Sequence, residues 1–502
     1  MIYSDEIWKK YVEKVESNFS LKTYAHFDPF FDFPTRKNEI KEIVDNTTSK
    51  STSTHSFLPF VKILTKTPRF RYLEDVGDYG LNTKIRPISY ASHKDSYIYG
   101  FYSFALNELY QDYIKRKGFD DCVLAYRTDL NGKCNIQFAK EVIDEIKKRG
   151  ECTAIALDIK GYFDHIDHDI LKEKWCKVLG LSRLPDDQFK VYETLTRYSY
   201  VNKKSILKHF NINLRRKARN KENWNTLLDL IPDEIKGHSF KDKFNLLRQR
   251  DLIVTNKPKN FNGELKNLGI PQGSSMSALL SNIYLIDFDK FLKKMSKELG
   301  FIYRRYCDDL LIICRSKMAG ELEELVMDEI AKYNLTIQKE KNELTEFRQN
   351  STGQIRAFDR RKIEEKSEVL NPENEEKYYT KLQYLGFEFD GQRTYIRSSS
   401  LSRYFRKMRG RIVKTVMMAN SPNSKSDKIF RKQLLHKYSH LGKRNFLTYA
   451  YNAASEFYTN SDGDIKEGMN SSSIRKQVSR HMEILKGELE KTDAQRKSWR
   501  KK

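Results

Sequence analysis

Short apolar runs in the middle of the chain have the length and composition of β-strands. Two of them, residues 301–303 and 310–314, flank a short polar segment that ends in Asp308 and Asp309. A strand, a tight turn and a second strand are the simplest structure for this order of residues. The pattern therefore predicts a hairpin that carries two carboxylates at its tip.

Two further stretches combine an apolar run with residues of chemical interest. Residues 154–157 are apolar and lead directly into Asp158, which predicts a carboxylate where a buried strand reaches the open edge of a sheet. Residues 269–289 begin with a turn at Pro271-Gln272-Gly273 and continue as a predicted helix. Small residues line one side of this helix, so a bulky neighbour could lie against it. These small residues are Ser274, Ser277, Ala278 and Ser281.

Apolar residues at helical spacing prevail in much of the remaining chain. They predict helices over residues 97–113 and 138–149, and another that begins after Asp167 and ends at Gly180. Beyond Gly391 the pattern is mainly helical. We therefore expect an α+β fold.

Composition indicates what kind of partner the chain has. Its 502 residues are enough for two or three subdomains, and its formal net charge is +24. The 29 tyrosines and 29 phenylalanines supply surfaces that can stack on bases. A polyanion such as nucleic acid is the expected partner; solubility, or a general affinity for RNA, is the alternative explanation of the charge.

The six cysteines form no CxxC pair and lie mostly among apolar residues. This predicts reduced thiols, not a zinc site or a disulfide framework. Residues 1–19 lack the pattern of a signal peptide, and no stretch is apolar for long enough to span a membrane. We therefore expect a cytoplasmic protein with no membrane partner.

The paired carboxylates indicate a chemical role. A carboxylate on an apolar hairpin is costly unless a positive charge compensates it, and a bound divalent cation is the usual compensation. The alternative is a surface turn in which Asp308 and Asp309 only add solubility.

Five short motifs, in a consistent order and spacing, make the chain similar to reverse transcriptases of the bacterial kind. That group contains group II intron, retron and abortive-infection or defence-associated enzymes. The resemblance covers roughly residues 60–395 and departs from the family at Asn342, where Thr or Ser is more usual. The matching residues are Asp158 with Phe163, Pro271-Gln272-Gly273, Tyr306-Cys307-Asp308-Asp309, Lys341 and Tyr384-Leu385-Gly386-Phe387.

The resemblance implies a right-hand polymerase fold of fingers, palm and thumb, with an antiparallel palm sheet, a helical insertion and a helical C-terminal thumb. We expect the last helix to dock on the thumb; joining two subunits into a homo-oligomer is the alternative. The implied division is an N-terminal extension at 1–56, fingers at 57–150, a palm at 151–395 with a basic helical insertion at about 186–262, a thumb at 396–458, and a C-terminal helix and basic tail at 459–502.

The same resemblance implies roles for individual residues around two Mg²⁺ ions, for which Mn²⁺ can substitute. Asp158 and Asp308 would bridge the metals, Asp309 would be a secondary ligand, and Ile159 would add its carbonyl. Contacts to the incoming nucleotide would come from Lys84, Arg86, Phe163, Gln272 and Lys341.

Phe163 occupies the position of the family's steric gate, where a ring beneath the sugar excludes a 2′-hydroxyl; an ordinary core residue is the alternative. For Lys84 and Arg86 the alternative is a solvated strand edge.

Basic residues in three regions are candidates for nucleic-acid contacts, with a plain solvated helix face as the alternative in the insertion. The candidates are Arg127 in the fingers, Arg215 and Arg216 in the insertion, and Arg403, Arg406 and Lys407 in the thumb.

The implied function is RNA-directed DNA polymerase, with dNTPs as substrates, DNA as product and a dedicated noncoding RNA as template in phage defence. Two alternatives remain open at this point: untemplated or protein-primed DNA synthesis by the same site, and a non-catalytic RNA-binding scaffold.

Overall fold

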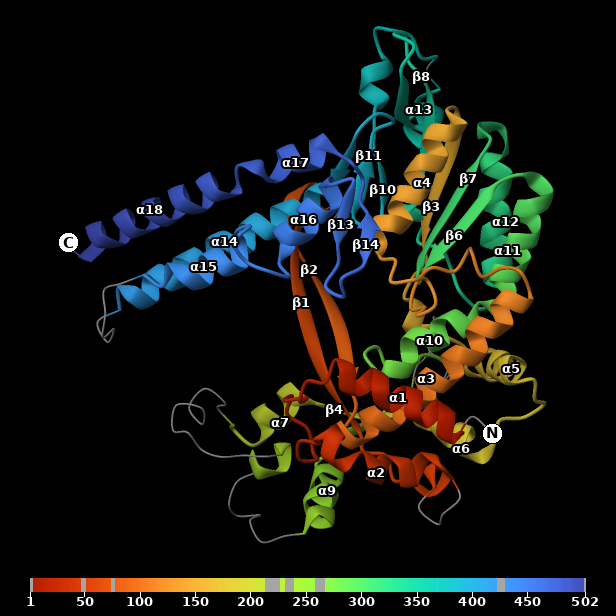
Figure 1. The fold of residues 1–502 in the computed structure, drawn as a ribbon, viewed down its shortest axis with the longest axis vertical. Coiled ribbons are helices and arrows are strands. Elements are labelled where there is room, and N and C mark those ends of the chain that lie inside the picture. Colours follow the sequence, from red (N-terminus) through yellow and green to blue (C-terminus); the bar gives the residue numbers. More distant parts are fainter. Residues whose placement is uncertain are drawn as a thin grey trace.

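A computed structural model describes residues 3–46, 51–73, 77–212, 226–230, 239–257, 267–367, 369–421 and 429–500. Figure 1 shows the N-terminal helices in its lower half, a long two-stranded ribbon that rises from them towards the C-terminal helices, a sheet with its helices at the upper right, and long C-terminal helices at the upper left. None of the described helices is both long and apolar enough to cross a membrane.

The sheet at the upper right of Figure 1 is the predicted palm sheet. Its strand order is β6-β7-β3-β8-β9, and every neighbouring pair is antiparallel, which confirms the expected antiparallel palm. Its strands are β3 (Cys152–Asp158), β6 (Ile302–Tyr306), β7 (Asp309–Cys314), β8 (Glu343–Gln349) and β9 (Ile355–Asp359).

Two apolar cores flank this sheet because successive residues of a strand point to opposite faces. Ile155 and Leu157 pack into one core with helices α3, α10, α11 and α12. Ala154 and Leu311 pack into the other, with α4 and the C-terminal helices. These palm helices are α3 (His93–Arg116), α4 (Asn135–Arg149), α10 (Ser275–Tyr284), α11 (Ile286–Leu299) and α12 (Ala319–Ala331).

A second sheet of order β2-β1-β4-β5 belongs to the fingers region. It adds two short strands to the expected helical insertion at about 186–262, because β4 pairs in parallel with β1 and β5 pairs with β4. Arg215 and Arg216 lie outside the described residues. The strands of this sheet are β1 (Phe60–Leu73), β2 (Asp78–Tyr90), β4 (Ser199–Asn202) and β5 (Ile253–Thr255).

The C-terminal region forms a helical thumb beside a small sheet, β10-β11-β12. The last helix, α18, docks on α14, and its Leu485 and Leu489 are buried in the same core as Met408 and Ile412 of α14. Its apolar stripe is therefore used within the chain. The elements are β10 (Leu382–Tyr384), β11 (Phe387–Phe389), β12 (Thr394–Ile396), α14 (Ser398–Ala419), α15 (Arg431–Tyr438), α16 (Phe446–Ala454), β13 (Phe457–Thr459), β14 (Ile465–Glu467), α17 (Ser472–Ser479) and α18 (His481–Arg500).

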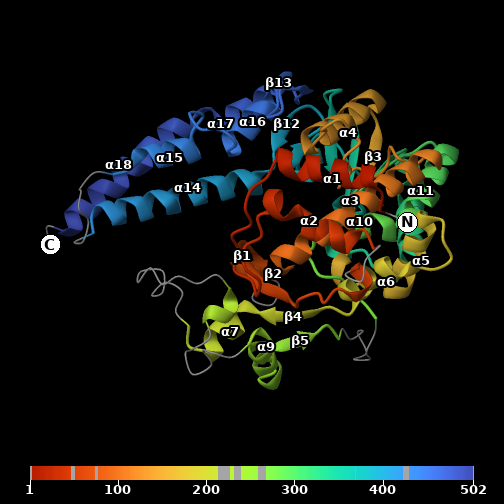
Figure 2. The same cartoon turned by 60° about the horizontal axis from the view of Figure 1, so that its bottom comes forward.

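The remaining helices cover the fingers and the edges of the palm (Figure 2). They are α1 (Asp5–Ser17), α2 (Phe33–Val44), α5 (His168–Leu179), α6 (Asp186–Thr196), α7 (Lys203–His209), α9 (Phe240–Gln249) and α13 (Arg360–Lys366). Helix α5 begins as predicted, because the Asp167 side chain accepts hydrogen bonds from the N–H groups of Asp169 and Ile170.

Candidate active site

Strands β3 and β7 bring carboxylates from distant parts of the sequence to one edge of the palm sheet. Their antiparallel register places Asp158 directly opposite Asp309. The next residue along, Ile159, donates its N–H to the carbonyl oxygen of Asp308 at 3.1 Å. The three aspartates are therefore neighbours, although about 150 residues separate Asp158 from Asp308 and Asp309 in the chain.

The hairpin turns sharply between β6 and β7, as its sequence predicts. Cys307 has a φ of 60°, in the left-handed region that is unusual for a residue with a side chain. Asp308 lies in this turn and Asp309 is the first residue of β7. The turn thus releases the two aspartates from the strict alternation that would point them to opposite faces of the sheet.

A buried ion pair between Arg305 and Asp289 supports the turn between β6 and β7. Arg305 and Asp289 have no exposed side-chain surface, and Arg305 Nε donates to Asp289 Oδ1 at 2.8 Å. Arg305 Nη1 also donates to the Cys307 carbonyl at 3.2 Å and to the Asn282 side chain at 3.1 Å. Tyr303 donates its hydroxyl to Asp289 at 2.7 Å. This network was not predicted from the sequence; an arginine at an inward position of an apolar strand is the signal that could have indicated it.

A cavity of about 390 Å³ lies beside the carboxylates, and Asp158, Asp309, Lys341, Glu343 and Arg397 are among its lining residues. Asp309 keeps exposed surface in this cavity. Loss of water around it, followed by repulsion from Asp308 and Asp158, raises its pKa to about 6. Burial likewise raises the pKa of Glu343, against the opposing attraction of Arg397. Sequence analysis singled out neither Glu343 nor Arg397.

The donor atoms at this edge fit a divalent cation. In the described part of the chain no three Asp, Glu, His or Cys side chains are already arranged as a metal site. Two cations partly compensate these carboxylates: Lys341, whose Nζ lies 2.5 Å from Asp158 Oδ2, and Arg397, which acts on Asp309. Their attraction does not prevent the rise in the pKa of Asp309. Oxygen ligands that repel one another suit Mg²⁺, which takes a few carboxylates and retains water molecules. Ile159 is buried, and its N–H is donated to the Asp308 carbonyl.

The predicted nucleotide-binding residues Phe163 and Gln272 come together through backbone bonds. Phe163 lies half-buried in a short 3-10 helix (Tyr162–Asp164), and its carbonyl accepts the N–H of Ile270 at 2.9 Å. Two residues further on, the Gln272 carbonyl accepts the N–H of Ser89 from β2 at 2.8 Å. Gly273 is required here, because its φ is 118° and a Cβ would lie 2.8 Å from the Ser89 carbonyl.

The other basic candidates have different surroundings. Lys84 and Arg86 lie along β2, opposite Thr67 and Thr65 of β1. The structure contradicts the expectation that Arg127 contacts nucleic acid. Its side chain is 1% exposed, pairs with Asp129 at 2.6 Å and donates to the Val123 carbonyl at 3.1 Å. The ion pair with Asp129 thus holds the Arg127 side chain inside the protein.

The thumb presents a strongly basic surface. Arg403, Arg406 and Lys407 are exposed on α14 and make no ion pair with any described residue. A cavity of about 530 Å³ adjoins Arg403 and Lys407 and extends to Gly386 in the turn between β10 and β11.

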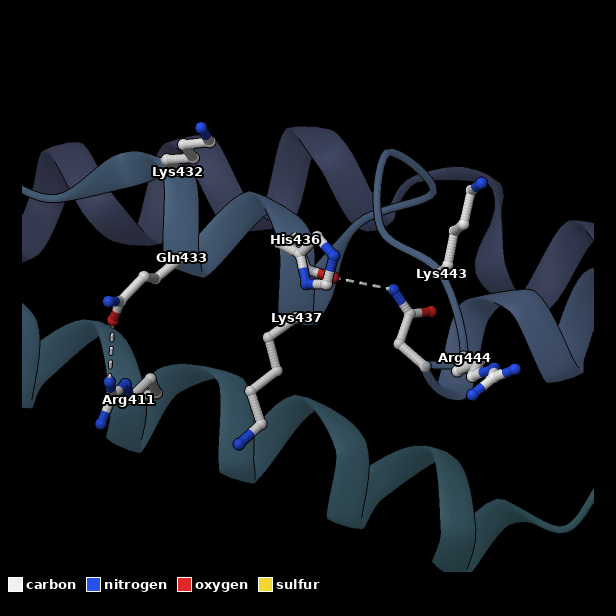
Figure 3. A pocket seen from close by; sticks show the side chains of 8 residues that line it. Arg411, Lys432, Gln433, His436, Lys437, Lys443 and Arg444 are labelled. Carbon is white, nitrogen blue, oxygen red and sulfur yellow. Dashed lines mark hydrogen bonds between the residues drawn. The ribbon is translucent and has the colours of Figure 1, made fainter. Parts of the chain in front are cut away.

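A neighbouring cavity of about 500 Å³ lies between α14 and α15, and none of the described residues that line it is acidic (Figure 3). Its basic side chains come from both helices and from the loop before α16. They are Arg411, Lys432, His436, Lys437, Lys443 and Arg444.

One family of known proteins is similar to part of this chain. Residues 209–389 match the family model described as reverse transcriptase (RNA-dependent DNA polymerase). The match includes Gln272, Asp308 and Lys341, whereas Asp158 precedes it. No curated protein matches the chain.

Two solved structures with weak similarity are telomerases. Apo telomerase from Candida tropicalis, truncated from its C-terminal domain, is 10% identical with a TM-score of 0.35, over 68% of this chain and 57% of that chain. Telomerase from Candida albicans, in complex with a TWJ fragment of telomeric RNA, is 12% identical with a TM-score of 0.33, over 96% of this chain and 69% of that chain. This chain thus spans little more than half of the first structure.

The antiparallel palm sheet, its carboxylate hairpin and the helical thumb agree with the polymerase fold that the sequence predicts. The family match covers residues 209–389, which include the carboxylate hairpin. Over these residues the chain is similar to the reverse transcriptase family, whose enzyme class is RNA-directed DNA polymerase.

Proposed function

We propose that this chain copies RNA into DNA by adding dNTPs to a primer 3′-hydroxyl, with Asp158, Asp308 and Asp309 as its catalytic residues. The observation that carries the proposal is the register of β3 and β7. It places Asp158 opposite Asp309 and bonds Ile159 to Asp308, so carboxylates from two separate motifs share one sheet edge. A surface turn used only for solubility would not need this convergence.

The proposed metal ligands are the three aspartates and the Ile159 carbonyl. Two Mg²⁺ ions bound there would neutralise the triphosphate and lower the pKa of the attacking hydroxyl. Lys341 contributes a positive charge that already lies against Asp158. The raised pKa of Asp309 indicates a site that gains from added positive charge.

Substrate selection is assigned to the neighbouring Phe163 and Gln272. The Phe163 ring would exclude a 2′-hydroxyl, and the bond between Ser89 and Gln272 fixes the turn that approaches the nucleotide. The exposed cations of α14 would bind the phosphates of the template–primer duplex. The cavity that joins Arg403 and Lys407 to Gly386 supports this, because it connects the basic thumb with the turn assigned to the primer grip.

Primer extension with the purified chain tests this function. A DNA primer on a defined RNA template, with Mg²⁺ and dNTPs, should give DNA complementary to the template. A product whose sequence is unrelated to the template, or no product with either Mg²⁺ or Mn²⁺, would contradict templated synthesis.

For the cell, we propose a dedicated noncoding RNA as template and a cytoplasmic role in phage defence. The support is the resemblance of the motifs to the bacterial group and the basic thumb. Sequencing the nucleic acid that copurifies with the chain should return one predominant RNA and its DNA copy. A sample of unrelated cellular RNAs would contradict a dedicated template.

Protein-primed synthesis is a second candidate that one observation favours. Tyr126 is 45% exposed and lies beside Cys307 and Asp308, where burial and these neighbours raise the pKa of its hydroxyl. A tyrosine next to a catalytic carboxylate could receive the first nucleotide. Labelled dNTP that stays on the protein after nuclease treatment, and is absent in Tyr126→Phe, would favour this route over a separate primer.

A further inference from the structure

The fingers carry an unusually long ribbon made of β1 and β2. The two strands pair without interruption from Val61 opposite Tyr90 to Leu73 opposite Asp78. At roughly 3.3 Å per residue, the ribbon is about 40 Å long. Only its base joins the fingers sheet, through the pairs that Phe60, Val61 and Lys62 make with β4. In both views the far end lies near the base of the thumb, across the space between fingers and thumb (Figures 1 and 2).

The base of this ribbon is fixed to the candidate active site. Ser89 donates its N–H to the Gln272 carbonyl at 2.8 Å, and Gly273 packs so closely on Ser89 that a Cβ would not fit. Lys84 precedes Ser89 by five residues in β2 and lies nearer the far end of the ribbon, about 17 Å from Ser89 at the usual strand rise. Most of the ribbon therefore extends beyond the Gln272 turn.

The exposed part of the ribbon combines apolar and basic side chains. Leu64 is 46% exposed, Leu81 67% and Ile85 51%. Lys66 and Arg86 are exposed beside them, and no Asp or Glu occurs in residues 60–73 or 79–90. The acidic residues are confined to the far end, where Asp78 begins β2 and Glu74 and Asp75 precede it in the sequence. A two-stranded ribbon without a covering layer is only marginally stable in water, so a partner would stabilise it. Between its base and its far end the ribbon carries basic residues and no acidic ones, which makes a polyanion the complementary partner there.

We propose that the ribbon beyond its base is a clamp that contacts the template–primer nucleic acid and holds it between successive nucleotide additions. The inference rests on the proposed polymerase function and adds to it an element that governs how long the nucleic acid stays bound. Cations on the ribbon would contact phosphates, and Leu64, Leu81 and Ile85 would contact sugars. This contact is distinct from the triphosphate role considered for Lys84 and Arg86, because it concerns the strands and not the incoming nucleotide.

A shortened ribbon tests the clamp. Residues 68–83 are replaced by Asn-Gly, which forms a two-residue turn between the cross-strand partners Thr67 and Lys84. This variant keeps Arg86 and the bond from Ser89 to Gln272. We expect single-nucleotide addition within about twofold of the parent, while the DNA made per binding event, with excess competitor as a trap, shortens at least about fivefold. Dissociation of a labelled RNA–DNA duplex, measured without nucleotides, should accelerate in proportion.

A double substitution provides a version that leaves the ribbon intact. The double variant Lys66→Glu with Leu81→Glu reverses one charge and adds another, so the ribbon keeps charged groups, and therefore its solubility, but repels phosphate. Its matched control is Lys117→Glu with Leu181→Glu, the same two changes at exposed positions outside the ribbon. We expect faster duplex dissociation and shorter products for the double variant and parental behaviour for the control.

Three results would overturn the clamp. The first is parental product length and dissociation in both ribbon variants. The second is a loss of single-nucleotide addition as large as the loss of product length, which would place the ribbon in the chemical step. The third is equal acceleration by the control Lys117→Glu with Leu181→Glu, which would reduce the effect to net charge. Because duplex dissociation needs no catalysis, it still tests the clamp if the parent makes no DNA, and that failure would count against the proposed function alone.

Discussion

At the scale of single residues, Phe163 tests how the site chooses its substrate. The ring is half-buried in the 3-10 helix that follows Asp158, and its backbone is bonded to Ile270 beside the Gln272 turn. We expect Phe163→Ala to raise the use of rNTPs relative to dNTPs by about 10-fold or more, because the change removes steric exclusion of a 2′-hydroxyl. Phe163→Tyr keeps the ring and should keep the selectivity. Unchanged selectivity in Phe163→Ala would make the residue an ordinary part of the core.

The ion pair beneath the carboxylate hairpin gives a prediction about stability. Arg305→Met leaves Asp289 buried without its partner, and we expect a loss of about 3–5 kcal/mol, seen as a lower thermal midpoint. Arg116→Met breaks a pair with Asp112 in which both side chains are more than half exposed, so it should change the midpoint little. Equal midpoints for the two variants would contradict a supporting role for Arg305.

The site residues that could be predicted from the sequence are those that belong to a local sequence pattern. Asp158 directly follows an apolar run, Asp308 and Asp309 directly precede one, and the structure brings the three together. Glu343 and Arg397 could not be foreseen, because they meet at the cavity only after β8 and the start of α14 have packed. The prediction for Arg127 is wrong because a basic residue near a turn looks like a phosphate contact, until its ion pair with Asp129 is seen.

At the scale of elements, the segment before α2 contains a buried group that titrates. His26 is 0% exposed, and no described residue hydrogen-bonds its ring nitrogens. Burial lowers its pKa from an ordinary 6.5 to about 4, despite Asp28 nearby. Between these two pH values the unfolded chain binds a proton that the folded chain does not. Folding stability should therefore fall as the pH drops from about 6.5 towards 4, by at most about 3 kcal/mol from this residue.

A comparison of two histidine variants checks this dependence. His26→Phe should flatten the fall in thermal midpoint between pH 6.5 and 4.5, because it removes the titrating ring from its buried position. His209→Gln, a change at an exposed position on α7, should keep the parental slope. The prediction fails if both variants show the same slope as the parent.

Long and strongly periodic elements were predictable, whereas short strands were not. The carboxylate hairpin, the helix capped by Asp167 and the thumb helices have patterns that a sequence displays locally. Strands β4 and β5 are only four and three residues long and lie within a basic segment. Their identity as strands depends on pairing with β1 and with each other, which is tertiary information.

At the scale of the whole molecule, the basic thumb contributes to the net charge of +24. We expect Arg403→Gln with Lys407→Gln to weaken binding of an RNA–DNA duplex and to lower the slope of log affinity against log salt by about 1 for each phosphate that is no longer neutralised. Arg183→Gln with Lys117→Gln removes the same charge at two exposed positions outside the thumb. Fluorescence anisotropy over a salt series measures both pairs, and equal slopes would mean that only net charge matters.

The whole account depends on carboxylates from separate strands acting as one catalytic site. The most direct measurement is Mg²⁺-dependent dNTP incorporation on a primed RNA template by Asp158→Asn and Asp308→Asn, with Asp164→Asn as an exposed control in the same segment as Asp158. We expect both site variants to lose at least about 10³-fold in rate while they still fold and bind duplex, and the control to stay within about twofold. Undiminished incorporation by either Asp158→Asn or Asp308→Asn would contradict the account.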